Sequence, residues 1–115
     1  MTTYDRGDIV LVKFVFAGDK GVKQRPGLLV SSDRYHRGRR EAILAAITSN
    51  VGRSLIGDYQ LELWKEAGLP LPSTVTAIIR TITRNMIIRK IGTLPAAELA
   101  HVESRLRISL ALPGA

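Results

Sequence analysis

The apolar residues of this chain come in short runs, and turn-forming residues separate the runs almost throughout. Because β-branched residues are frequent in them and each is too short for a long helix, the runs predict strands. Gly, Pro, Asn and charged residues stand between them, as expected of turns. About six strands are predicted, from the runs "DIVLVKFVF" (8–16), "GLLVSS" (27–32), "AILAAITS" (42–49), "DYQLEL" (58–63), "TVTAIIRTIT" (74–83) and "IIRKIG" (87–92).

Several local features refine this prediction. Residues 42–49 leave a helix open because alanine favours one, but their short length and β-branched residues favour a buried strand. Pro26 cannot donate to a ladder and is expected at the start of the second strand. The segment "AGDKGVKQ" before it is typical of a hairpin loop, and the strongly basic residues 33–40 are expected to form a loop. The segment "KEAGLPLPS" predicts a short turn or a helical turn closed by Gly68.

The C-terminal segment has a helical pattern instead. Pro95 stands near the expected start, and Glu98 lies in the first turn, where it complements the helix dipole. Apolar residues recur at spacings of three and four, so one helix face should pack on the sheet, and "PG" at 113–114 ends the pattern. The stripe consists of Leu99, Val102, Leu106 and Leu110. We therefore expect a mostly β fold, a small barrel with a packed C-terminal helix, as a single domain over residues 1–115.

Composition excludes several classes of site. The chain has no cysteine, so thiolate metal sites and cysteine nucleophiles are excluded. His36 and His101 are the only histidines; they are expected in the basic loop and on the helix surface, without carboxylates at ligand spacing. A phosphate-binding P-loop is missing, and a Ser-His-Asp triad has no elbow motif behind it. No apolar run reaches the ~20 residues of a membrane span, and we expect a cytoplasmic protein without metal or cofactor.

The charge of the chain points to a polyanionic partner. Seventeen Lys and Arg against ten Asp and Glu give a net charge of +7, and arginine forks match phosphate groups. A solvated basic surface is the alternative. Arg25 precedes Pro26, which holds it extended, and Thr48 and Ser49 end another predicted strand. An arginine beside a hydroxyl suits phosphoryl transfer, although such residues are also common as surface and turn residues.

In order along the chain, "GDIVLVKFVF", "KQRPGLLVSSDRYH", "ILAAITSN", "PLPS" and "IIRKIGTL…EL" resemble the MazF/PemK-like toxin endoribonucleases from Gly7 to Leu112. The resemblance implies an SH3-like barrel of the plasmid maintenance toxin type, which forms a homodimer. It also implies metal-independent, sequence-specific cleavage of single-stranded mRNA, which inhibits translation, and a cognate acidic antitoxin. Arg25 of "K-x-R-P" and Thr48 of "ITS" match the catalytic pair of that family.

The remaining site predictions concern RNA binding. Basic and polar residues around the first hairpin loop and the "ITS" strand end are expected to hold RNA: Lys20, Lys23, Gln24, Ser49, Asn50, Arg53 and Arg80. Tyr35 is a candidate for base stacking, although it more often packs on a core. The chain departs from the family at Lys13 and Val15, where relatives have proline, and at 76–78, where relatives carry a basic and an acidic residue.

Two other functions remain open on the sequence. Related toxins of the same fold poison DNA gyrase without cleaving RNA, but they lack the Arg-Thr pair that this chain keeps. A catalytically silent nucleic-acid-binding barrel is the second alternative, which the missing acidic residue near Ala77 and Ile78 favours.

Overall fold

The computed structural model describes residues 3–15 and 21–114. Six strands, two α-helices and one 3-10 turn follow one another along these residues. In chain order they are β1 (Asp8–Val15), β2 (Val22–Leu29), α1 (Asp33–Gly38), β3 (Glu41–Thr48), β4 (Tyr59–Gln60), β5 (Thr74–Thr83), η1 (Arg84–Met86), β6 (Ile87–Thr93) and α2 (Ala96–Leu110).

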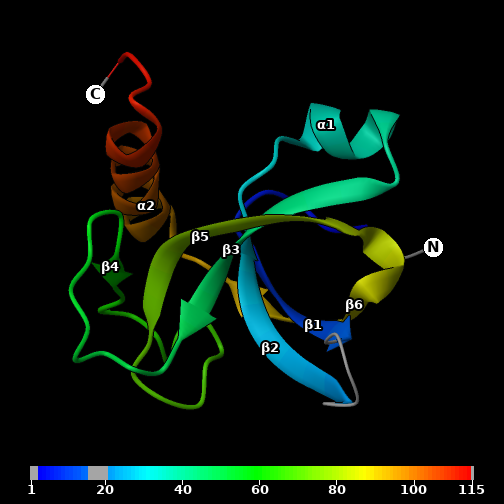
Figure 1. Cartoon of the computed structure of the whole chain (residues 1–115), viewed down its shortest axis with the longest axis horizontal. Coiled ribbons are helices and arrows are strands. Elements are labelled where there is room, and N and C mark those ends of the chain that lie inside the picture. Colours follow the sequence, from blue (N-terminus) through cyan, green and yellow to red (C-terminus); the bar gives the residue numbers. More distant parts are fainter. Residues whose placement is uncertain (1–2, 16–20, 115) are drawn as a thin grey trace.

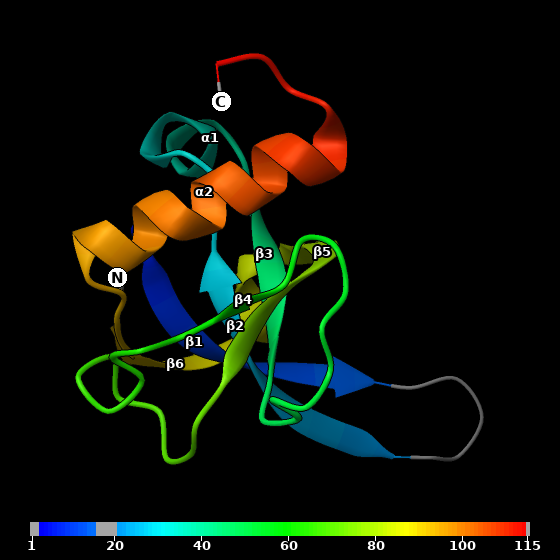
Figure 2. The ribbon, with the colours of Figure 1, turned by 90° about the vertical axis from the view of Figure 1, so that its left-hand side faces the viewer.

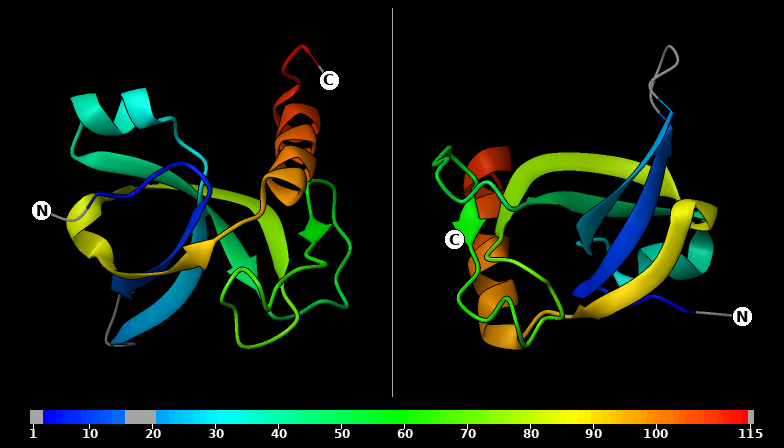
Figure 3. Two further views of the ribbon diagram at one scale, coloured as in Figure 1. Left: turned by 180° about the vertical axis from the view of Figure 1, so that it is seen from behind. Right: turned by 90° about the horizontal axis from the view of Figure 1, so that it is seen from below.

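The strands form one antiparallel sheet in the order β4-β5-β3-β2-β1-β6. The sheet curls strongly. At the end of β5 that is remote from α2, η1 connects β5 directly to β6 (Figures 1 and 3). Residues on one face of the curled sheet enclose a core (Val10, Val12, Phe14, Leu29, Ala42, Leu44, Ile82 and Ile87). The predicted mostly β fold, a small barrel with a C-terminal helix, is confirmed.

A second core lies between the other face of the sheet and α2. Ile9, Leu28 and Val75 of the sheet are buried there with Val102 of the helix. Leu99 and Leu106 pack partly against this core, as the stripe predicted, but Leu110 is 52% exposed because the last turn of α2 extends past the core residues. The helix ends at Leu110, just before the predicted "PG" stop, with Ala111 in the left-handed conformation as its cap.

The structure confirms the strands predicted at 42–49 and 74–83 and the break after Thr83. The prediction that Pro26 begins a strand is wrong, since β2 starts at Val22 and Pro26 pairs with Leu11 inside it. β3 pairs with β2 only at residues 27–29, so the β2 edge that faces away from β1 is unpaired at Pro26. An unpaired edge tolerates a residue without an N–H donor.

Two other elements differ from their predictions. The basic segment 33–40 contains the short helix α1, for which Ser32 is the N-cap through a hydrogen bond from the Tyr35 N–H to its Oγ. The strand predicted at 58–63 is only two residues long, because its pairing with β5 stops after Gln60. Among the described residues, no helix is long and apolar enough to cross a membrane.

Candidate active site

A cleft opens at the place where β2 and β3 separate. The two strands pair at three positions, of which Gly27–Ala46 is the last toward the β1–β2 hairpin. Beyond it, β1 and β2 continue together past the end of β3, as Figure 2 shows. The opening has a volume of about 690 Å³. Its lining comes from β1, β2, β3, β5 and the loop before β5: Phe14, Gln24, Arg25, Pro26, Leu44, Ala46, Ile47, Thr48, Ser49, Leu69, Pro70, Leu71, Ser73, Ile78 and Arg80.

Arg25 and Thr48 occupy matching positions on the two sides of this opening. The observed register pairs Gly27 with Ala46, and two further residues along each strand lead to Arg25 and Thr48. Directly opposed residues of an antiparallel pair project to the same face. Both residues line the cleft, so the structure brings together the two residues that the sequence placed on separate strands.

Local contacts fix the two side chains differently. Arg25 is exposed, and its only hydrogen bond within the described residues runs from Nη1 to the Gln24 carbonyl at 3.2 Å, so most of the guanidinium is available to a ligand. Thr48 Oγ1 accepts the Asn50 N–H at 3.1 Å at the end of β3. Since that bond uses an oxygen lone pair, the Thr48 hydroxyl proton can be donated into the cleft.

The close approach of β2 to β3 below the cleft depends on Gly27. A Cβ atom there would lie 3.0 Å from Leu44 Cδ1, which is tighter than ordinary packing allows. Leu44 fills the space over the glycine and forms the floor of the cleft. The last pair of the two strands, and with it the position of Arg25, is therefore set by this contact.

β5 and the loop before it contribute apolar side chains to the lining of the cleft. A bulge in β5 faces Ala46, where the Thr76 hydroxyl donates to the Ala46 carbonyl at 2.8 Å and accepts the Ile78 N–H at 3.1 Å. Ile78 and Leu71 line the cleft with about half of each side chain exposed. The Arg80 guanidinium carbon lies 4.6 Å from the centre of the Phe14 ring, which places a second cation at the cleft. The chain thus presents an isoleucine within the stretch where relatives are expected to have charged residues.

The other predicted RNA-binding residues are distributed unevenly. Gln24, Ser49 and Arg80 line the cleft. Lys23 is an exposed residue of β2 and Asn50 follows the end of β3, both next to lining residues. Arg53 lies outside the lining, and Lys20 lies outside the described residues.

The Arg53 side chain is engaged within the protein. Its Nε and Nη2 atoms donate to the Asp58 carboxylate at 2.8 and 3.0 Å. The hydrogen bonds from Arg53 hold the pKa of Asp58 below its usual value, and the Leu55 N–H adds to this effect against the cost of burial. This pair orders the loop between β3 and β4.

The lining of the cleft limits its chemistry. It contains two guanidinium groups and the hydroxyls of Thr48, Ser49 and Ser73, but no described carboxylate or imidazole. Among residues 3–15 and 21–114, no group of three or more His, Asp or Glu side chains is arranged to hold a metal ion. The arrangement is suited to holding a phosphodiester by charge and hydrogen bonds.

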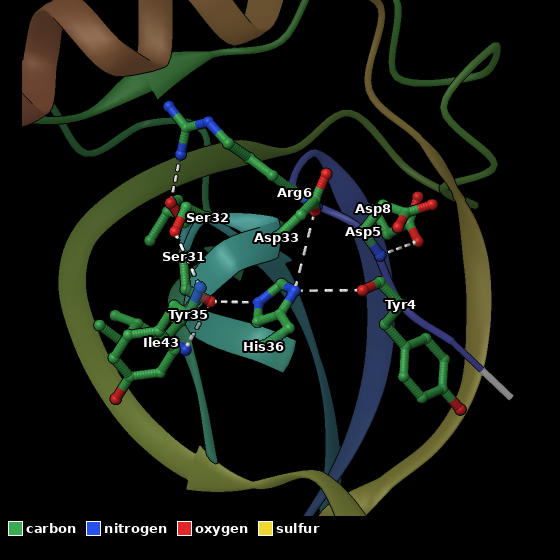
Figure 4. A network of polar contacts seen from close by, with 11 residues as sticks. Tyr4, Asp5, Arg6, Asp8, Ser31, Ser32, Asp33, Tyr35, His36 and Ile43 are labelled. Atoms are coloured by element: carbon green, nitrogen blue, oxygen red, sulfur yellow. Dashed lines mark hydrogen bonds and ion pairs between the residues drawn. The ribbon is translucent and has the colours of Figure 1, made fainter. Parts of the chain in front are cut away.

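The prediction that His36 lies in a basic loop is wrong, since the residue belongs to the helix α1 (Figure 4). The ring is buried on α1; Nδ1 lies 3.1 Å from the Tyr4 carbonyl and Nε2 lies 2.5 Å from Ser31 Oγ. Because a carbonyl only accepts, Nδ1 donates, and in the neutral ring Nε2 accepts from Ser31. Ser31 Oγ also accepts the Ile43 N–H at 3.0 Å and is buried, and Asp33 lies 3.9 Å from the ring. These residues hold α1 to the barrel and do not form a catalytic triad.

Sequence reasoning missed the structural role of Glu98. Its buried carboxylate accepts the Tyr59 hydroxyl at 3.0 Å and the backbone N–H groups of Glu62 and Leu63 at 2.6 and 3.1 Å. Burial, with the hydrogen bond to Glu98, raises the pKa of Tyr59 to about 12. His101 is exposed on α2, as predicted, and stacks on Tyr59. This network ties α2 to the segment after β4, on which part of the cleft wall depends.

The sequence matches one protein family along almost its whole length. A family model described as "PemK-like, MazF-like toxin of type II toxin–antitoxin system" matches residues 5–110. The chain is also 31% identical, over 102 residues, to "Endoribonuclease MazF9" from Mycobacterium tuberculosis (strain ATCC 25618 / H37Rv). That match covers 83% of this chain and 85% of the relative.

Solved structures share the fold at lower sequence identity. The MazE-MazF structure (Form-II) from Deinococcus radiodurans matches with a TM-score of 0.82 and 21% identity, covering 97% of this chain and 99% of the other. An endoribonuclease in complex with its cognate antitoxin, from a Mycobacterial species, matches with a TM-score of 0.79 and 19% identity over 98% and 100% of the two chains. At these identities the structural matches establish the fold, and the family assignment rests on the sequence matches.

Proposed function

Since the chain belongs to the PemK-like, MazF-like toxin family of type II toxin–antitoxin systems, we propose that it is an endoribonuclease that cleaves single-stranded RNA in the cleft between β2 and β3. The single observation that carries this proposal is the placement of Arg25 opposite Thr48 in that cleft. A toxin with this activity would act on mRNA in the cytoplasm and inhibit translation.

Arg25 and Thr48 would act on the same phosphodiester. The RNA 2′-oxygen attacks the adjacent phosphorus, and the bond from phosphorus to the 5′-oxygen breaks, leaving a 2′,3′-cyclic phosphate and a 5′-hydroxyl. Negative charge builds on the non-bridging oxygens in the transition state, and the Arg25 guanidinium would stabilise it. The Thr48 hydroxyl, which accepts the Asn50 N–H through one oxygen lone pair, keeps its proton to donate a hydrogen bond to the same group.

The proton of the 2′-hydroxyl must go to water or hydroxide, and the departing 5′-oxygen must take a proton from water. Among the described residues that line the cleft, none carries a carboxylate or an imidazole that could take it near neutral pH. The protein would therefore contribute charge stabilisation and positioning, with the nucleophile supplied by the RNA itself. This mechanism requires no resident metal ion or cofactor.

Residues around the cleft would hold the RNA on either side of the scissile phosphate. Gln24, Ser49 and Arg80 line the cleft, and Lys23 and Asn50 lie beside it. Lys20 and Arg53 are also proposed to contact RNA, on different grounds. Lys20 is one of the basic residues in the sequence between Val15 and Arg25, whereas Arg53 would have to leave its ion pair with Asp58 to contact RNA.

Two partners complete the proposal. Solved MazE-MazF complexes share this fold, and an acidic antitoxin would compete with RNA for the cations of the cleft. A second copy of the chain would cover the apolar groove of about 500 Å³ between β5 and the end of α2, where Ile79, Leu106 and Leu110 meet. Exposed apolar grooves of this kind mark interfaces, so we expect a homodimer at micromolar concentration, and a stable monomer in sedimentation would contradict this.

The test is incubation of the purified protein with a long single-stranded RNA in the presence of EDTA. Discrete RNA fragments would support the endoribonuclease, because a gyrase-poisoning toxin and a silent nucleic-acid-binding barrel both leave RNA intact. A matched preparation of Arg25→Ala, expressed and purified in the same way, controls for contaminating ribonuclease. Intact RNA with the wild-type protein, or equal cleavage by both preparations, would refute the proposed function.

A further inference from the structure

A group of basic residues that do not line the cleft lies near the start of β3, at the end of the strand opposite Thr48. Four arginines fall within residues 34–40, on α1 and in the turn after it: Arg34, Arg37, Arg39 and Arg40. Arg84 of η1 joins them, since its backbone N–H donates to the Arg40 carbonyl at 2.9 Å and its Nη2 to the Arg39 carbonyl at 2.6 Å. We call these five residues the α1 arginine cluster.

The protein itself neutralises little of this cluster. Arg39 is paired with Glu41 at 2.9 Å and lies over the Tyr35 ring, with 4.9 Å from Cζ to the ring centre. Arg34 and Arg37 are exposed, and the described residues give them no hydrogen bond and no ion pair. They stand three positions apart on α1, where like charges destabilise a helix. An external anion would relieve this repulsion.

Buried contacts hold α1 in place despite that repulsion. His36 is anchored to the Tyr4 carbonyl and to Ser31, and Asp33 accepts the Arg6 N–H at 3.1 Å (Figure 4). A helix of six residues is not stable alone in water, so these contacts to distant parts of the chain account for its order. The arginines are thus presented from a fixed platform, which lowers the entropic cost of binding a ligand.

The end of β5 and η1 connect the α1 arginine cluster to the cleft between β2 and β3. Arg80 lines the cleft between β2 and β3, and Arg84 lines a second cleft of about 550 Å³ together with Arg37, Tyr4 and His36. Arg84 follows Arg80 by four positions, which in extended chain is a distance of roughly 13 Å. β4 pairs with β5 only at Thr74 and Val75, so among the described residues no strand covers the same edge of β5 from residue 77 to 83.

From this arrangement we propose that the α1 arginine cluster is a second RNA-binding surface, which holds the phosphate backbone flanking the cleaved site. Arginine forks fit phosphate oxygens, and Tyr35 under Arg39 provides an aromatic ring beside them. The carboxylates of Asp5 and Asp33 also line the second cleft, so the phosphates are placed on the exposed arginines and not within it. The proposal deepens the proposed endoribonuclease function and rests on it for the identity of the ligand.

The test measures binding separately from cleavage. Two RNAs are compared, one of about 5 and one of about 20 nucleotides, because one small nucleic-acid-binding barrel covers ~4–16 nucleotides. Both RNAs carry 2′-O-methyl groups, which remove the nucleophile and prevent cleavage. Their dissociation constants are measured by fluorescence anisotropy over a series of salt concentrations. The variant is Arg34→Gln/Arg37→Gln. The control is Lys65→Gln/Arg89→Gln, which removes the same charge from exposed residues of the turn after β4 and of β6.

The expected result is specific to the long RNA. Each phosphate contact on a single strand makes the plot of log K against log salt steeper by ~0.7, so losing two contacts should make it shallower by about 1.4. The control should bind both RNAs as the wild type does. The proposal is overturned if the cluster variant binds the long RNA like the control, or if it weakens both RNAs equally.

A further arm distinguishes RNA from an acidic protein partner. If the cluster variant loses affinity for a Glu-rich peptide but keeps the wild-type salt slope with the long RNA, the surface belongs to an acidic peptide and the RNA proposal is wrong. Cleavage of unmodified RNA is scored separately. If the wild type does not cleave RNA but its binding still depends on RNA length and on the α1 arginine cluster, the endoribonuclease proposal is refuted and the second RNA-binding surface is supported.

Discussion

Arg25 on β2 and Thr48 on β3 stand opposite each other two residues beyond Gly27–Ala46, the last pair that joins these strands. The hydrogen bonds that would connect them as ladder residues are not made, and a cleft lies in their place. Arg25 keeps most of its guanidinium available, and Thr48 is oriented by the Asn50 N–H. Two side chains with unused donors are thereby held on either side of a space that admits a phosphodiester.

Arg25→Ala should abolish most of the activity and leave the fold intact. The side chain is exposed and its one hydrogen bond stays within neighbouring residues, so little packing is lost. Removing one charge-stabilising donor costs on the order of 3 kcal/mol in the barrier, or ~100-fold in kcat/KM. Steady-state cleavage rates and a melting curve measure both effects. Arg25→Lys keeps the charge without the fork and should recover only part of the rate; a near wild-type rate for the alanine variant would refute the role of Arg25.

Thr48→Val should reduce the cleavage rate at nearly unchanged stability. The substitution removes a hydroxyl that accepts a hydrogen bond from the exposed backbone N–H of Asn50, so the stability loss should stay below about 1 kcal/mol. Rate and melting temperature are measured on one preparation, with Thr48→Ser as the control that retains the hydroxyl. A large fall in melting temperature with an unchanged rate would mean that the hydroxyl is purely structural.

The cleavage rate should rise steadily with pH. Because the described lining of the cleft offers no group that titrates near neutrality, hydroxide removes the 2′-proton, and log kcat/KM should increase by about 1 per pH unit from about pH 6 to 8. Rates on a short defined RNA across this range provide the measurement. A bell-shaped profile would instead reveal a protein acid and base in the reaction.

Asp58→Asn should destabilise the protein at neutral pH but not in acid. The pKa of Asp58 is lowered in the folded protein, chiefly by the hydrogen bonds from Arg53, so its stabilisation is present above the unfolded pKa of ~3.9 and is lost as pH falls through the folded value. Melting temperatures of wild type and variant should differ at pH 7 and converge toward about pH 2. Arg53→Gln should behave alike. A deficit that is constant with pH would show that the carboxylate charge is not responsible.

Much of the fold could be predicted from local sequence. The density of β-branched residues indicated β5, and the break after Thr83 separated it from β6. For β3, whose alanines favour a helix, the short length and its β-branched residues decided for a strand. The position of Pro26 could not be predicted, because it depends on where β3 stops pairing with β2. The helix α1 has no apolar periodicity; its order comes from His36, whose partner Tyr4 is 32 residues away in the sequence.

The sequence predicted which residues form the candidate site better than it predicted how they are arranged in space. The motifs around Arg25 and Thr48 indicated a pair, and the register explains why the two lie on opposite sides of one cleft. Nothing in the sequence indicated that Asp58 would engage Arg53, or that Glu98 would accept two backbone N–H groups more than thirty residues away. Such contacts follow from the tertiary arrangement and have no local signal.

The most direct test of the account is a double-mutant cycle on the cleavage rate, made with Arg25→Ala, Thr48→Val and the variant that carries both. Residues that act on one group in the transition state lose rate together, so the double variant should be only slightly slower than Arg25→Ala alone. Equal fragment patterns from all active variants would show that the same phosphodiester is cleaved. If instead the two losses multiply fully, Arg25 and Thr48 act independently, and the proposed pairing across the opening between β2 and β3 is wrong.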